Sequence, residues 1–141
     1  MVLYARDIMK NYTKTFSASM SALEGAKIMQ QDHVGFLIVH DSDGTPTGIV
    51  TEWDYISKIV AAEKDPRNVT IGQIMKEGII SVEADTPTEK VTVIMSKNLI
   101  RRLPVFEKGK LIGVITSRDI IRIFKDYMDS ISEIIARFGN F

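Results

Sequence analysis

The sequence contains no cysteine, and this absence excludes disulfide bonds, thiolate catalysis and cysteine metal sites together. It also has no net charge, because 18 basic side chains balance 18 acidic ones. A chain with no surplus of either sign has no general attraction for nucleic acid or for an anionic membrane. We therefore expect any anion site to be local, and we expect neither nucleic acid nor a membrane as a partner.

Long hydrophobic runs are missing too. No segment approaches the ~18 apolar residues that cross a bilayer, and the start MVLYARDIMK lacks the apolar stretch of a signal peptide. These features favour a cytoplasmic protein. Hydrophobic residues nevertheless make up 45% of the 141 residues, which is enough for a folded core.

The common catalytic and metal-binding motifs are also absent. There is no glycine-rich phosphate loop, no nucleophile elbow and no zinc-protease motif. Asp41-Ser42-Asp43-Gly44 is similar to the start of a calcium loop, but that loop needs glycine where this chain has Pro46, so a turn is predicted. His33 and His40 have no second ligand at metal spacing. The sequence therefore predicts neither an enzyme nor a metal site.

The chain does contain an internal repeat. Ile8-Met9-Lys10 recurs as Ile74-Met75-Lys76, and GIVTEWD at 48–54 recurs as GVITSRD at 113–119. Two copies of one pattern in the same order indicate two similar structural units.

Each copy predicts a short preceding segment followed by helix, strand, strand and helix. The first helices are expected to begin at Ser19 and Thr86, and the closing helices near Glu52 and Ser117, with the earlier one ending around Lys64. The strands are predicted at 35–40, 47–51, 101–106 and 111–116. This pattern belongs to the α+β class, because a doubly wound parallel sheet needs more strand–helix units.

The second closing helix continues well beyond its counterpart. Apolar residues recur at spacings of three and four, which predicts ~20 residues of amphipathic helix; they are Ile120, Phe124, Tyr127, Ile131, Ile134 and Phe138. Such a stripe needs cover, either from its own chain or from a second copy. We expect a homodimer built partly from these helices.

The repeated motif ends in a hydroxyl followed three residues later by a carboxylate, in Thr51 with Asp54 and in Thr116 with Asp119. One interpretation is a capping box at a helix start, although that motif prefers glutamate or glutamine. The other is ligand binding, in which the carboxylate accepts vicinal ribose hydroxyls and the helix N-terminus favours a phosphate. The pattern leaves both open.

Arg101 and Arg102 open a strand whose counterpart in the first copy begins with Gly35-Phe36. The two arginines are either a solvated strand end or a phosphate contact, since guanidinium groups match phosphate oxygens. Trp53, directly before Asp54, packs on the sheet or forms a wall for an aromatic base.

These motifs resemble a tandem pair of cystathionine-β-synthase (CBS) domains, also called a Bateman module, from about Ala5 to about Lys125. The resemblance is carried by DIM at 7–9 and QIM at 73–75, by the strands GFLIV and RRLPV, and by the paired G-h-h-T/S-x-x-D strings, where h is hydrophobic. It implies CBS repeats at 5–66 and 67–125, with a C-terminal helical extension at 126–141. The implied fold is a disc of two pseudo-symmetric halves, with their short sheets packed together and two clefts between them.

The resemblance also implies a function. Such modules are regulatory sensors that bind AMP, ADP, ATP or S-adenosylmethionine, require no cofactor and rarely catalyse reactions. Carried over by position, Asp54 and Asp119 would hold ribose hydroxyls, and Thr51 and Thr116 would contact ribose or phosphate. In one cleft Ile80, Ile100 and Arg101 would face Asp54, and in the other Lys14, Val34 and Gly35 would face Asp119. The remaining residues expected in the clefts are Ile49, Trp53, Arg102, Val114 and Arg118, with Ile49 and Val114 beside the base.

No catalytic domain is recognisable in the chain, so the molecule that responds to the ligand is expected to be another polypeptide or the homodimer itself. The alternative is a structural or dimerisation protein without a small-molecule ligand, in which the two motifs only cap helices.

Overall fold

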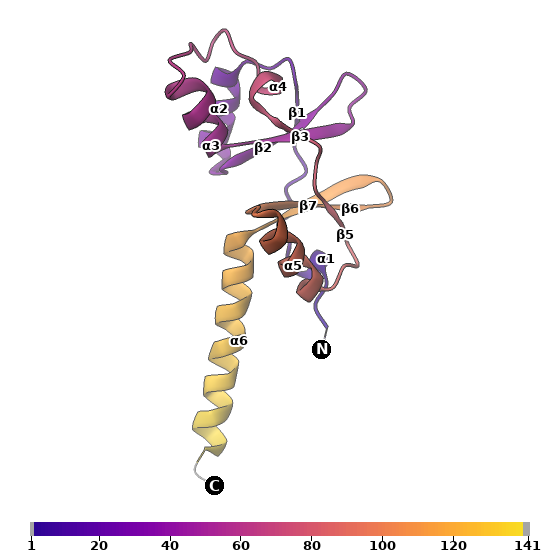
Figure 1. The fold of residues 1–141 in the computed structure, drawn as a ribbon. Coiled ribbons are helices and arrows are strands. Elements are labelled where there is room, and N and C mark those ends of the chain that lie inside the picture. Colours follow the sequence, from indigo (N-terminus) through magenta and orange to yellow (C-terminus); the bar gives the residue numbers. More distant parts are fainter. Residues whose placement is uncertain (1, 140–141) are drawn as a thin grey trace. The chain divides into compact units, whose positions relative to one another are not determined.

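The computed structural model describes residues 2–139, which form two compact units (Figure 1). The continuous unit runs from Lys14 to Ile79. The split unit combines the chain up to Thr13 with the chain from Ile80 onward. The units therefore differ from the two halves of the sequence repeat, because the segment that precedes each copy is built into the other unit.

The continuous unit is a mixed sheet with helices. Its strands β1 (Thr15–Ser17), β2 (Phe36–His40), β3 (Pro46–Thr51) and β4 (Lys76–Glu77) lie in the order β1-β2-β3-β4, with only the β1–β2 pair parallel. Helix α2 (Ala22–Asp32) precedes β2, and α3 (Glu52–Tyr55) follows β3 and continues as a π-helical turn, η1 (Ile56–Val60). Helix α4 (Ile71–Ile74) leads into β4. The core contains Ala22, Met29, Leu37, Val39, Val50, Ile59, Ile71 and Ile74.

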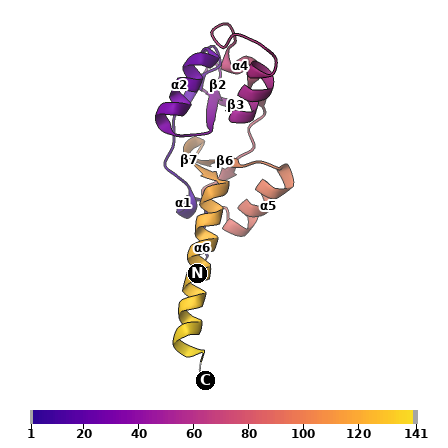
Figure 2. The ribbon, with the colours of Figure 1, turned by 90° about the vertical axis from the view of Figure 1, so that its left-hand side faces the viewer.

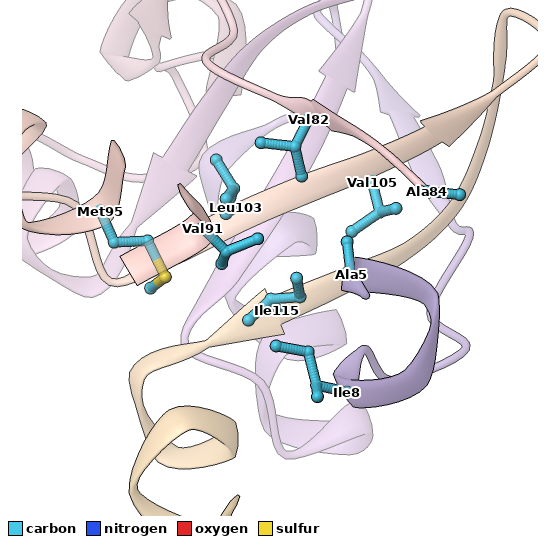
Figure 3. Close-up of a cluster of buried hydrophobic side chains, with 9 residues drawn as sticks. All are labelled: Ala5, Ile8, Val82, Ala84, Val91, Met95, Leu103, Val105 and Ile115. Carbon is cyan, nitrogen blue, oxygen red and sulfur yellow. The ribbon is translucent and has the colours of Figure 1, made fainter. Parts of the chain in front are cut away.

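The split unit repeats this plan. Strands β5 (Val82–Glu83), β6 (Arg102–Glu107) and β7 (Lys110–Thr116) form a sheet in that order, with β5 parallel to β6. The helices are α1 (Ala5–Ile8), α5 (Thr88–Asn98) and α6 (Ser117–Phe138). Figure 3 shows that Ala5 and Ile8 of α1 lie in one cluster with Val91, Leu103 and Ile115 from the distant part of the chain.

The exchanged segments make equivalent contacts in the two units. Lys10 exchanges two backbone hydrogen bonds with Val114 of β7, of 2.9 and 3.0 Å. In the continuous unit Lys76 is the register partner of Ile49 in β3. The glycine that begins each repeated motif makes room for the exchanged segment of its unit. A Cβ atom on Gly113 would lie 2.5 Å from the Lys10 carbonyl oxygen.

Most predicted elements are confirmed. The four strands, the turn after His40 and the starts of both closing helices lie where the sequence places them, and α6 is a single helix of 22 residues. Within that turn Asp41 Oδ1 accepts hydrogen bonds from the amides of Asp43 and Thr45. None of the helices described is long and apolar enough to cross a membrane.

Three predicted helix boundaries were wrong. Helix α2 is capped by Ser21 rather than Ser19, because the Ser21 hydroxyl accepts a hydrogen bond from the Glu24 amide. Helix α5 follows Pro87 rather than beginning at Thr86, whose amide instead bonds to the Glu83 carbonyl in a turn. The first closing helix ends at Val60 rather than near Lys64, because the chain turns through Glu63, which has a φ of 55°.

Candidate functional site

The two repeated motifs occupy equivalent places, at the junction of the last strand with the closing helix of each unit. Thr51 ends β3 and precedes α3, and Thr116 ends β7 and precedes α6. Both threonines have extended backbones and act as N-caps. The first amides of the closing helices therefore point toward these junctions, as they do at any helix N-terminus.

Each aspartate uses one oxygen to cap its own helix. Asp54 Oδ2 accepts from the Thr51 amide at 2.8 Å and from the Thr51 hydroxyl at 3.2 Å. Asp119 Oδ2 makes the same pair of bonds to Thr116, at 2.8 and 2.9 Å. Both helix starts form complete capping boxes. The capping interpretation of the motif is therefore correct, and it accounts for one oxygen of each carboxylate.

The second oxygens differ between the two units. Asp54 Oδ1 lies 3.1 Å from the ammonium of Lys58. Asp119 Oδ1 lies 3.2 Å from Nη1 of Arg122, yet it has no hydrogen-bond partner and its side chain is 0% exposed. The guanidinium is therefore close enough to balance the negative charge of the carboxylate. It forms no hydrogen bond because none of its N–H groups points at a lone pair of Asp119 Oδ1. We call Thr51, Asp54 and Lys58 the Asp54 site, and Thr116, Asp119 and Arg122 the Asp119 site.

Lys58 ties the Asp54 site to the end of a neighbouring helix. Its ammonium also donates to the carbonyl oxygen of Ile74, the last residue of α4, at 2.9 Å. In the repeat the place of Lys58 is taken by Ile123, which packs against the core of the split unit. The two carboxylates therefore share the same capping geometry but differ in their second oxygen. Asp54 Oδ1 is paired with Lys58, whereas Asp119 Oδ1 has no hydrogen bond.

The start of the preceding strand lies beside each motif. The Arg101 carbonyl accepts from the Ser117 amide at 2.9 Å, and the Gly35 carbonyl accepts from the Glu52 amide at 3.2 Å. The backbone of Arg101 is thus next to the first turn of α6, and its side chain is exposed. Arg102 is half-buried and is the register partner of Thr116.

The other predicted site residues divide between the units. Ile49, Trp53, Lys14, Val34 and Gly35 belong to the continuous unit, and Ile80, Ile100, Arg101, Arg102, Val114 and Arg118 to the split unit. Trp53 is 69% exposed, so it does not pack in the core. Lys14 forms an ion pair with Asp32 at 2.9 Å. The expected grouping of Asp54 with Arg101, and of Asp119 with Lys14, joins residues of different units and stays a prediction.

Two cations at these sites were missed from the sequence. Lys58 follows Asp54 by one helical turn, and Arg122 follows Asp119 in the same way. Cations three or four residues after an acid on a helix are a recognisable signal. Between residues 2 and 139 no group of three or more histidine, aspartate or glutamate side chains lies close enough together to hold a metal ion.

Comparison with known sequences gives relatives at moderate identity. An uncharacterized protein of Methanopyrus kandleri is 33% identical over 125 residues, covering 88% of this chain and 64% of that protein. L-aspartate semialdehyde sulfurtransferase of Methanocaldococcus jannaschii is 33% identical over 87% of this chain, but the match covers only 23% of the enzyme. The chain thus spans less than two thirds of the length of either relative.

Solved structures resemble the chain over more of their length. The CBS domain pair of protein MJ0100, in complex with 5′-methylthioadenosine and S-adenosyl-L-methionine, has a TM-score of 0.80 and 32% identity, covering 90% of this chain and 99% of that one. Hypoxic Response Protein I with two coordinated zinc ions has a TM-score of 0.74 and 28% identity, covering 85% and 98%. A hexameric CBS-CP12 protein from bloom-forming cyanobacteria has a TM-score of 0.79 and 32% identity, covering 86% and 67%.

The family match covers both copies of the repeat. The CBS domain model matches residues 5–61 and again residues 71–126, so each match contains one preceding segment and one T-x-x-D motif. The chain belongs to the CBS domain family, as a tandem pair.

Proposed function

We propose that this CBS pair is a regulatory module that binds an adenosine-containing ligand and does not catalyse a reaction. The observation that carries the proposal is Asp119 Oδ1, a buried carboxylate oxygen without a hydrogen bond. Buried hydrogen-bond acceptors nearly always have a donor, and leaving one without a donor lowers the stability of the fold by about 1–3 kcal/mol. An oxygen of this kind favours a ligand that brings a hydroxyl donor.

A ribose supplies suitable donors. Its vicinal hydroxyls can reach Asp119 Oδ1 when the Arg122 side chain, which is 54% exposed, swings aside. The displaced guanidinium would remain near the ligand, and Arg101 lies beside the same helix start. These cations and the N-terminus of α6 favour a phosphorylated ligand over the bare nucleoside. AMP, ADP and ATP are therefore candidates.

The relative bound to 5′-methylthioadenosine and S-adenosyl-L-methionine adds a second class of candidate. Both of these ligands contain the adenosine ribose, so they offer the same hydroxyls to a carboxylate. They lack phosphate, and the arginines near the Asp119 site would contribute little to their binding. The choice between the two classes thus depends on the basic residues rather than on Asp119.

A thermal-unfolding screen tests the proposal. The protein is heated with AMP, ADP, ATP, S-adenosylmethionine or 5′-methylthioadenosine, with inosine at the same concentration as the control for a purine riboside that lacks the adenine amino group. A ligand present at ~100 times its Kd adds ~2.7 kcal/mol of stability to the folded state. We expect at least one adenosine compound to raise the unfolding temperature, and no release of phosphate from ATP. No shift with any of the five would refute ligand binding.

The second candidate function is a structural or dimerisation protein without a small-molecule ligand. The observation in its favour is that both aspartates already complete a capping box, which gives each carboxylate a role without a ligand. The same screen separates the two functions, because a purely structural protein would not respond to any nucleotide.

We also propose that the working form is a homodimer and that the regulated partner is a separate polypeptide or the dimer itself. Support comes from the large apolar side chains exposed on α6, which a monomer would leave in water. Light scattering on the purified chain tests this, and a monomer at micromolar concentration would contradict it.

A further inference from the structure

Helix α6 carries an exposed apolar face along most of its length. We call this face the α6 stripe, and it consists of Ile121, Phe124, Tyr127, Met128, Ile131, Ile134 and Ile135. Six of these side chains are between 43% and 66% exposed, and Ile131 is half-buried. Of the apolar residues of α6, only Ile120 and Ile123, near its start, pack against the core of the split unit. Figures 1 and 2 show the rest of the helix extending away from the sheet of its own unit.

The stripe has the spacing of a helix–helix contact. Its members form three series with a period of seven: Phe124 with Ile131, Tyr127 with Ile134, and Ile121 with Met128 and Ile135. Seven residues are almost two helical turns, so each series stays on one face. Three apolar positions in seven give the width of a face that packs in a helical bundle.

The opposite face of α6 is polar and contains two ion pairs within the helix. Lys125 pairs with Asp129 at 3.0 Å, and Arg137 pairs with Glu133 at 3.0 Å. These i,i+4 pairs favour the helical conformation where the rest of the unit gives no support. The helix is therefore amphipathic along its exposed length, and its apolar face is the side left to be covered.

We propose that the α6 stripe packs against the α6 stripe of a second copy of this chain. The inference rests on the homodimer of the proposed function and names its contact surface. Helix α6 contains four basic and four acidic side chains, and a helix without net charge has no general attraction for an anionic membrane or a strongly charged partner. A neutral apolar face is complementary to itself, which is what a twofold contact requires.

The exposed area of the α6 stripe is close to that of a stable interface. A large apolar or aromatic side chain buries roughly 150–200 Å² when fully covered, so six such side chains at about 60% exposure present roughly 600 Å². This approaches the ~800 Å² that each partner contributes to a stable interface. It also reaches the upper end of the ~300–600 Å² patch that a typical monomer leaves exposed. One stripe against another is thus large enough for a specific dimer.

Two adjacent substitutions test the contact surface. Ile135→Glu places a charge in the α6 stripe, and Ala136→Glu places the same charge on the next residue, which points away from the stripe. Neither residue belongs to a buried core cluster, so both variants should fold, which circular dichroism would verify. The mass of each full-length variant is measured by light scattering across a concentration series, together with the shift produced by the best adenosine ligand.

We expect a dimeric wild type, a dimeric Ala136→Glu variant and an Ile135→Glu variant whose dimer dissociation constant is raised at least 100-fold. If Ile135→Glu stays as dimeric as the wild type, the stripe is not the interface, although the homodimer itself survives. A monomeric wild type overturns both the homodimer and the contact between α6 stripes. If that monomer also binds vesicles of anionic lipid, the α6 stripe is assigned to a membrane surface instead. Ligand shifts that persist in a monomeric Ile135→Glu variant would show that ligand binding and pairing are separate properties.

Discussion

Arg122 lies one helical turn after Asp119 in α6, and its Nη1 atom approaches Asp119 Oδ1 to 3.2 Å without forming a hydrogen bond. The carboxylate is buried and the guanidinium is half exposed. Asp119 Oδ1 therefore keeps its hydrogen-bonding capacity, and a ligand hydroxyl would use it by taking the place of the Arg122 guanidinium.

Asp119→Ala should therefore weaken the binding of the adenosine ligand by about 1.5–3 kcal/mol, the usual worth of hydrogen bonds to a charged group. It should also lower the free energy of unfolding by about 0.5–2 kcal/mol, because the cap of α6 is lost. Titration calorimetry on the folded variant measures the first effect. Asp54→Ala is the parallel variant for the other unit, and unchanged affinity in both variants would leave the aspartates with capping alone.

Arg101→Ala should narrow the difference in affinity between AMP and adenosine. A lost guanidinium–phosphate contact penalises the charged ligand only, and the penalty should shrink as salt is added. Titration of the variant with both ligands at two salt concentrations measures this. Equal losses for AMP and adenosine would indicate that Arg101 shapes the strand start rather than contacting phosphate.

Gly113→Ala should lower the free energy of unfolding by about 1–3 kcal/mol, as overpacking commonly does. The new Cβ atom would lie 2.5 Å from the Lys10 carbonyl oxygen and 2.6 Å from the Met9 sulfur. The side chain of Met9 can move, but the carbonyl is fixed by the backbone pair between Lys10 and Val114. Urea unfolding measures the loss, and adding Met9→Ala should not rescue it. A full rescue would show that the sulfur, not the backbone, limits the space.

Tyr55→Phe should reduce the fall in the free energy of unfolding that the wild type shows between pH 10 and about 12. The Tyr55 hydroxyl donates to the Ala22 carbonyl at 2.7 Å, and burial raises the pKa of Tyr55 from 10.0 to about 12. As the pH rises above 10, the unfolded chain loses this proton first, so stability falls between pH 10 and about 12. Below pH 10 the stabilisation by the protonated Tyr55 hydroxyl is complete and does not change with pH. Unfolding free energies of wild type and variant across that range should converge if the hydroxyl is responsible.

The elements that the sequence predicted well are those with strong local signals. The strands on either side of Asp41-Ser42-Asp43-Gly44 are apolar runs bounded by turn residues, and α6 has an uninterrupted helical period. The missed elements are short ones, such as α1, α4 and the parallel strands β1 and β5. They contain two to four residues each and depend on partners far away in the sequence, which local propensity does not encode.

For the site, the sequence correctly placed Thr51, Asp54, Thr116 and Asp119 at two equivalent helix starts. It did not reveal that the second oxygens differ, because that depends on where Lys58 and Arg122 point once the helices form. Nor did it predict the π-helical turn at Ile56–Val60 that distinguishes the first closing helix from α6.

Because α1 belongs to the split unit, the two units can complete their folding only in a fixed order during synthesis. Residues 14–79 leave the ribosome as one stretch and contain the whole continuous unit, so that unit can fold while translation is still under way. Ala5 and Ile8 emerge earlier but find their core partners only after Leu103 and Ile115 have been made. Until then the N-terminal segment exposes apolar side chains, and a nascent chain stalled before β7 would be a natural substrate for chaperones.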